Sequence, residues 1–201
     1  YNMDGTVALQ QERHFPAAAD RATIIGPIDF PVNVSNVHFI KLELHDSAGK
    51  LLSTNFYWRA GSEHPDDLSD LNKLPTVTLQ PTVERHDEAG RCRITVTLRN
   101  PSKDIALMAH IQLRRKSGER VLPVYYDTNY VSLVPGESRT IHIDADLKDL
   151  HGEDALVVLD GWNDTVAPAS SEGASIAPNT EADPMQSPET GLPFQTVGLR
   201  K

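Results

Sequence analysis

Residues 91–99 have the sequence "RCRITVTLR", in which small or apolar side chains alternate with charged or hydroxylated ones. Because successive side chains of a β-strand point to opposite faces of a sheet, this alternation predicts a strand with one buried face. The predicted buried side chains are those of Cys92, Ile94, Val96 and Leu98. A strand of this kind needs partners, so the neighbouring sequence decides the fold.

Six further segments of strand character lie on either side of this one. They are residues 76–84, 105–115, 121–126, 130–134, 138–146 and 154–162. In the second of them, the predicted core side chains are Leu107, Ala109, Ile111 and Leu113. Turn sequences such as "DEAG" and "VPGE" separate the segments. Seven short strands joined by turns predict a complete immunoglobulin-like β-sandwich over residues 76–164.

Residues 1–60 contain fewer strands. The clearest pair is residues 37–46 and 51–58, which alternate in polarity and are joined by a glycine-containing turn. Residues 6–15 and 21–31 are weaker strand candidates. Four strands are too few for a sandwich that needs about seven. We therefore expect this region to be the C-terminal half of an immunoglobulin-like domain, whose other strands come from elsewhere.

Two segments lack strand alternation. Residues 61–75 are polar and predict a linker, with one short helical turn near residues 65–74. Residues 165–201 are dominated by Pro, Ser, Ala, Gly and acidic residues, which bury too little apolar area to offset the entropy of ordering. The predicted fold class is thus all-β: a partial sandwich, a complete sandwich and a disordered, flexible tail.

The charge balance limits the classes of partner. Nineteen basic and 28 acidic side chains give a formal net charge of -9, which repels nucleic acids and anionic membrane surfaces. No stretch approaches the roughly 18 apolar residues of a membrane span. The single cysteine, Cys92, fits a small core residue and does not decide the compartment. A secreted or periplasmic location is favoured.

No motif of the sequence predicts an active site, a metal site or a cofactor. The eight histidines have no metal-ligand spacing, and His38, His110 and His142 fall on the solvent side or at the margin of strands. The carboxylate pairs Asp66–Asp67 and Asp144–Asp146 are expected to be solvated. Two glycosylation triplets, at Asn33 and Asn163, arise often by chance and carry little weight.

The stretch "YYDTNY" at residues 125–130 is the one candidate for ligand contact, because aromatic faces beside amide and carboxylate groups suit a sugar. The candidate ligand-binding residues are Tyr126, Asp127, Asn129 and Tyr130. Tyrosines at the corner of a sandwich more often pack and form one hydrogen bond, so a structural role stays open beside ligand contact.

Several strings together resemble one family. They are "STNFYW" (53–58), "DDLSDLNKLP" (66–75), "VTLRNPSKDIALMAHIQLRR" (96–115), "LPVYYDTNYVSLVPGES" (122–138) and "DGWN" (160–163). In combination, over about residues 1–164, the sequence resembles the C-terminal region of family 2 glycoside hydrolases of the exo-β-glucosaminidase, β-mannosidase and glycoprotein endo-β-mannosidase group.

This resemblance implies a retaining multi-domain enzyme in which a (β/α)₈ barrel carries two catalytic glutamates and immunoglobulin-like domains follow. The barrel motifs have no counterpart here, so the resemblance assigns no catalytic residue to this chain. It implies a scaffold fragment that is bound to an N-terminal chain with the barrel and whose assembly acts on a carbohydrate. The alternatives are a stand-alone carbohydrate-binding or adhesion module and a purely structural surface domain.

Overall fold

The computed structural model describes residues 1–180. Its strands are β1 (His38–His45), β2 (Leu51–Arg59), β3 (Val77–Glu88), β4 (Arg91–Arg99), β5 (Ala106–Arg115), β6 (Val124–Tyr126), β7 (Val131–Leu133), β8 (Ser138–Asp146), β9 (Ala155–Asp160), β10 (Asp164–Val166), β11 (Ala169–Ser171) and β12 (Ala174–Pro178). The same residues contain the 3₁₀ helices η1 (Ser69–Lys73) and η2 (Leu147–Leu150). No helix in this part of the chain is long and apolar enough to cross a membrane.

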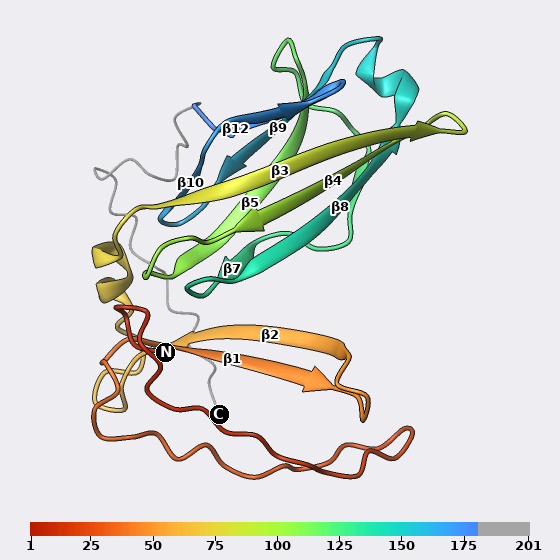
Figure 1. Ribbon diagram of the computed structural model, residues 1–201. Coiled ribbons are helices and arrows are strands. Elements are labelled where there is room, and N and C mark those ends of the chain that lie inside the picture. Colours follow the sequence, from red (N-terminus) through yellow and green to blue (C-terminus); the bar gives the residue numbers. More distant parts are fainter. Residues whose placement is uncertain (181–201) are drawn as a thin grey trace, which may run out of the picture.

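Two five-stranded sheets form a sandwich (Figure 1). The strand order is β10-β3-β4-β8-β6 in one sheet and β11-β12-β9-β5-β7 in the other. Strand β4 lies at the centre of its sheet and pairs antiparallel with β3 and β8. Its four predicted inward side chains are at most 1% exposed. Burial raises the pKa of the Cys92 thiol to about 11, which keeps this residue a core side chain and not a nucleophile.

All seven strands predicted between residues 76 and 162 are present. One detail of their faces differs from the expected alternation. The pairing of β5 with β7 shifts between Ala106 and Ala109, and Met108 adopts a φ of 61°. This bulge turns Leu107 out of the sandwich core and into a second apolar cluster, whereas the other three predicted side chains of β5 remain in the core.

The prediction of a flexible tail from residue 165 is wrong for residues 165–178. They complete the sandwich, because β10 pairs in parallel with β3 and β12 pairs in parallel with β9. Val166 and Ile176 are 2% and 1% exposed. Strands this short show no clear alternation, and they are held by partners far away in the sequence. Residues 181–201 of the predicted tail lie outside the described residues.

The first 60 residues contain one hairpin, β1–β2, which confirms the clearest predicted strand pair. The weaker strands expected at residues 6–15 and 21–31 are absent, so that prediction is wrong. These segments run along the side of the hairpin that faces away from the sandwich (Figure 1), without a ladder of backbone hydrogen bonds to it. A strand persists only where its backbone groups find partners, and these segments have none in a sheet.

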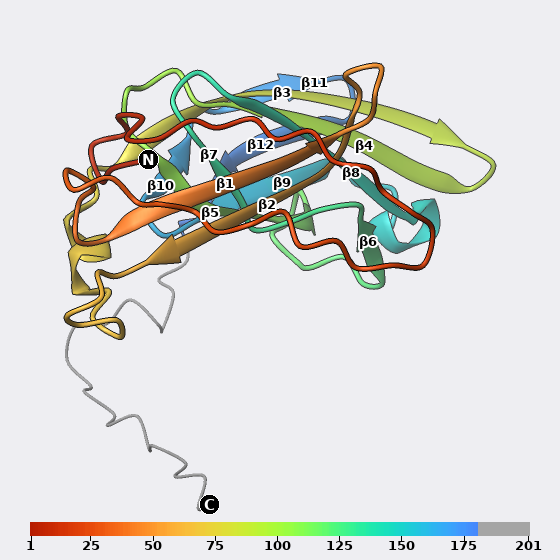
Figure 2. The ribbon, with the colours of Figure 1, turned by 90° about the horizontal axis from the view of Figure 1, so that it is seen from below.

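The hairpin packs against one end of the sandwich (Figure 2). Phe39 of β1 and the displaced Leu107 of β5 belong to one buried cluster, which also takes in Leu71 of η1. Lys41 Nζ crosses the same boundary and lies 3.0 Å from Glu137 Oε1. The helical turn expected in the linker is therefore η1, and it serves as part of the contact between the two units.

The burial of β12 generates a stability prediction. We expect Ile176→Ala to lower the free energy of unfolding by about 2–5 kcal/mol, because it leaves a cavity in the sandwich core. The exposed Ser170→Ala on the adjacent β11 should change it by less than about 0.5 kcal/mol. Urea unfolding monitored by tryptophan fluorescence measures both. Equal, negligible effects would mean that residues 165–178 do not belong to the folded sandwich.

Candidate functional site

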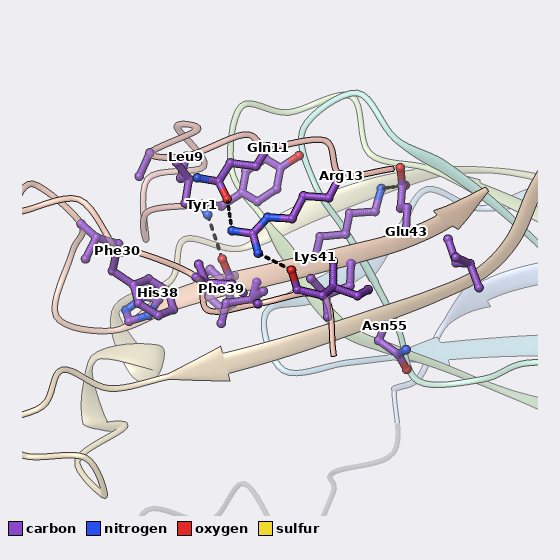
Figure 3. Close-up of a pocket in the computed structure, with 18 of the residues that line it drawn as sticks. Tyr1, Leu9, Gln11, Arg13, Phe30, His38, Phe39, Lys41, Glu43 and Asn55 are labelled. Atoms are coloured by element: carbon purple, nitrogen blue, oxygen red, sulfur yellow. Dashed lines mark hydrogen bonds and ion pairs between the residues drawn. The ribbon is translucent and has the colours of Figure 1, made fainter. Parts of the chain in front are cut away.

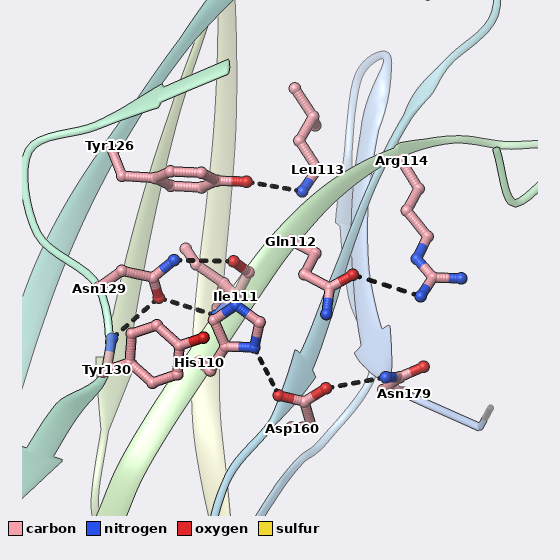
Figure 4. Close-up of polar contacts among 10 residues, drawn as sticks. All are labelled: His110, Ile111, Gln112, Leu113, Arg114, Tyr126, Asn129, Tyr130, Asp160 and Asn179. Atoms are coloured by element: carbon pink, nitrogen blue, oxygen red, sulfur yellow. Dashed lines mark hydrogen bonds and ion pairs between the residues drawn. The ribbon is translucent and has the colours of Figure 1, made fainter. Parts of the chain in front are cut away.

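Tyr126, the first of the four candidate residues, points into the sandwich end. Its hydroxyl oxygen accepts a hydrogen bond from the backbone N–H of Leu113 at 2.9 Å (Figure 4). Burial of the side chain raises the pKa of this hydroxyl. The bond joins the end of β6 to β5 in the opposite sheet, so this tyrosine has a structural role.

Asp127 and Asn129 are also engaged with backbone groups. Asp127 Oδ1 accepts from the N–H of His142 at 2.8 Å. Asn129 pairs with Ile111 through both of its side-chain atoms: Oδ1 accepts from the N–H at 2.9 Å and Nδ2 donates to the carbonyl at 2.9 Å. In this way the Asn129 amide takes the place of a neighbouring strand and fixes the loop to β5.

Tyr130 differs from the other three because its ring lies at the surface. It is 58% exposed and stacks on the imidazole of His110, with ring centroids 4.3 Å apart and planes inclined by 11° (Figure 4). His110 Nδ1 lies 2.7 Å from Asp160 Oδ1, and Asn179 Nδ2 donates to Asp160 Oδ2 at 2.8 Å. Of the predicted residues, only Tyr130 therefore belongs to an exposed polar cluster.

The sequence analysis missed His110 and Asp160 as members of this cluster. They face each other across the β5–β9 ladder. A register for the predicted strands 105–115 and 154–162 would have placed them in one cross-strand pair. His38, expected at the solvent side or margin of its strand, is instead 5% exposed.

The two carboxylate pairs that were considered as possible catalytic pairs either bind a structural partner or remain at the surface. Asp144 and Asp146 both bind the Arg91 guanidinium across the β4–β8 ladder. Hydrogen bonds and ion pairs from Lys148 and Arg91 lower the pKa of Asp146. Asp66 and Asp67 lie exposed in the loop before η1. Among residues 1–180 no group of three or more His, Cys, Asp or Glu side chains is arranged to hold a metal ion.

The second glycosylation triplet lies in the interior. Asn163 is 9% exposed, and its Nδ2 donates to the carbonyls of Pro75 and Ile105 at 2.7 and 2.9 Å. Its Oδ1 accepts from the N–H of Leu107 at 2.9 Å. A glycan on this nitrogen would replace one of its two N–H donors and would need room at a side chain that is only 9% exposed, so the folded chain does not present Asn163 as an acceptor.

Asp164, next to this amide, is the most perturbed acid of the described chain. Its Oδ1 accepts from the N–H of Leu107 at 3.0 Å, while Oδ2 is buried without a hydrogen-bond partner. Burial raises the pKa of this carboxyl from 3.8 to about 8. Gly161 makes room for the carboxyl, since a β-carbon there would lie 2.7 Å from Oδ2.

A hollow lies on the outer side of the hairpin (Figure 3). It has a volume of about 550 Å³ and lies between β1–β2 and the irregular residues 8–34. Ile40, Leu42 and Leu44 line its hairpin side, and the last two are 44% and 42% exposed. This hollow is an unfilled core between two layers and has no convergent catalytic groups.

The Tyr126 bond predicts a difference between two adjacent tyrosines. We expect Tyr126→Phe to lower the free energy of unfolding by about 1–3 kcal/mol, because it leaves the buried Leu113 N–H without an acceptor. Tyr125→Phe is the matched control, since Tyr125 is 63% exposed. Chemical denaturation measures both variants. If the two variants lose the same free energy of unfolding, the hydrogen bond does not contribute to holding β6 against β5.

The raised pKa of Asp164 predicts a pH dependence of stability. Between about pH 4 and pH 8 the folded state keeps a proton that the unfolded state releases, so stability falls as pH rises through this window and levels off above it. We expect Asp164→Asn to reduce this decline, whereas the exposed Asp66→Asn should not. Urea midpoints at pH 5 and pH 8 measure the effect, and an unaltered decline in Asp164→Asn would contradict it.

Comparisons with known proteins agree on one family. The model of the exo-β-D-glucosaminidase Ig-fold domain matches residues 55–164. The exo-β-D-glucosaminidases of Streptomyces avermitilis and Amycolatopsis orientalis are each 30% identical, over 81% and 91% of this chain. The crystal structure of Amycolatopsis orientalis exo-chitosanase CsxA superposes with a TM-score of 0.69 at 29% identity, over 82% of this chain and 22% of that one.

The chain spans 20% of the length of the two curated relatives, in which the matching region is part of a longer polypeptide. The resemblance inferred from the sequence strings and the all-β, immunoglobulin-like fold are thereby confirmed. The chain belongs to the exo-β-D-glucosaminidase Ig-fold domain family.

Proposed function

We propose that this chain serves as the accessory scaffold of a retaining β-glycosidase that hydrolyses β-D-glucosaminidic bonds, with the catalytic barrel in another part of the assembly. The names of the relatives support the choice of glucosaminidic over mannosidic bonds. The lining of the hollow beside β1 supports a non-catalytic role, since its one acidic side chain, Glu43, forms an ion pair with Lys41.

The observation that carries the proposal is that residues 1–60 leave far more large hydrophobic side chains exposed than the sandwich does. Thirteen of the 17 large hydrophobic side chains that are exposed in the described chain belong to residues 1–60. Exposed apolar area of this extent marks an interface. In the proposed assembly, strands that accompany the barrel cover the hollow beside β1 and pair with the outer edge of β2, whether they are on the same polypeptide or on a separate N-terminal chain.

Native mass spectrometry of the protein from its natural source tests this assembly. We expect the chain in a species several times larger than 22 kDa that hydrolyses an aryl β-D-glucosaminide with retention at the anomeric carbon. The isolated chain should show no hydrolysis. A stable 22 kDa monomer in the native source, or hydrolysis by the isolated chain, would contradict the proposal.

A charge placed in the open hollow tests the contact itself. We expect Leu44→Glu to weaken the assembly at least about tenfold, because it buries an unpaired carboxylate between the two layers. Ser47→Glu, in the exposed turn of the same hairpin, makes the same change of charge and should leave assembly intact. Co-purification of the chain with the barrel-containing part measures both. Loss in neither variant would place the interface elsewhere.

A further inference from the structure

The backbone of Tyr130 has an unusual conformation that several bonds maintain. Its φ is 54°, in the left-handed region that a residue with a β-carbon seldom adopts. The Asn129 amide, bound to both backbone groups of Ile111, also accepts from the Tyr130 N–H at 3.0 Å. Conformations of this kind are retained mainly where a side chain must be aimed. Here the result is a tyrosine ring laid flat over His110.

Only one face of the Tyr130 ring is used by this contact. The imidazole covers one side, and the 58% exposure of the residue leaves the other side open (Figure 4). The face of an aromatic ring carries partial negative charge and attracts polarised C–H groups and cations. A sugar ring with an ammonium group offers both.

His110 adds a hydrogen-bond acceptor beside the ring. An ionised carboxylate can only accept, so the 2.7 Å contact with Asp160 places a proton on Nδ1. In the neutral imidazole Nε2 is then an acceptor, and it has no hydrogen-bond partner among residues 1–180. Asn179 holds the second oxygen of Asp160, so the histidine is oriented before any ligand arrives.

The charge of the surroundings suits a cationic ligand. The chain has a formal net charge of -9, and the Asp160 carboxylate lies directly behind His110. The cation on the same face of β5 is Arg114, which is 5% exposed and separated from His110 by Gln112. An ammonium group near Tyr130 therefore meets the carboxylate and the acceptor nitrogen before it meets a like charge.

We propose that Tyr130 and His110 form a surface subsite for one β-linked glucosaminyl unit of an oligomeric substrate, with Asn129 and Asp160 as positioning residues. The choice of an amino sugar rests on the proposed function. The sugar ring stacks on the open face of Tyr130, and a hydroxyl or ammonium group donates to His110 Nε2. The subsite lies on the accessory piece and takes no part in bond cleavage.

Titration of the full 201-residue chain with a β-1,4-linked glucosamine tetramer tests the subsite, with calorimetry for affinity and NMR of the histidine side chains for location. We expect shifts of the His110 resonances and saturable binding. Tyr130→Gly should weaken binding at least about tenfold while the fold persists, because glycine suits a φ of 54°. His110→Ala should weaken it as well. Tyr125→Ala removes another exposed tyrosine and should leave affinity unchanged.

Absence of His110 shifts, or equal affinity in Tyr130→Gly, would overturn the subsite. Equal binding of a β-1,4-linked glucose tetramer would overturn its assignment to an amino sugar. These outcomes are independent of the hydrolysis assay: a chain that binds the tetramer through Tyr130 but occurs in no glucosaminidase supports the subsite and refutes the proposed function. A glucosaminidase whose accessory chain binds nothing does the reverse.

Discussion

The buried side chain of Asn163 holds three separate stretches of the chain at one point. Its amide satisfies the carbonyls of Pro75 and Ile105 and the N–H of Leu107. The backbone carbonyl of Asn163 accepts a hydrogen bond from the backbone N–H of Val77 at the start of β3. A buried polar group without a partner is costly, so these bonds act as mutual constraints on where β3 and β5 begin. The neighbouring indole of Trp162 donates to the Leu71 carbonyl and adds η1 to the same junction.

This junction explains how the complete sandwich holds the partly uncovered β1–β2 hairpin in place. The bulge in β5 sends Leu107 toward the hairpin, where Phe39 and Leu71 complete a cluster shared by both units. The hairpin is thus fixed on its inner face by packing and by the Lys41–Glu137 ion pair, although its outer face has little cover. A fixed hairpin presents that outer face in one orientation.

The sequence predicts the central strands well because each has one buried face and at least five residues to display it. β4 is the clearest case, with every predicted core side chain buried. The short β10 and β12 escape prediction because parallel pairing with distant β3 and β9 stabilises them, and no local pattern records this pairing. β11 in turn pairs antiparallel with β12. For the candidate site, residue type singled out Tyr130, but its partner His110 follows only from strand register. The backbone roles of Asp127 and Asn129 depend on loop geometry that composition does not contain.

The parallel pairing of the last strands has a consequence for biosynthesis. β3, the first strand of the sandwich, borders β10, and β9 borders β12. While the ribosome is still extending the polypeptide, both of these strands have an unpaired edge until residues 164–178 have left the exit tunnel. Long-range pairing of this kind delays folding and lengthens the time in which sheet edges are open to other nascent chains. Completion of the sandwich therefore waits until residues 164–178 have been synthesised.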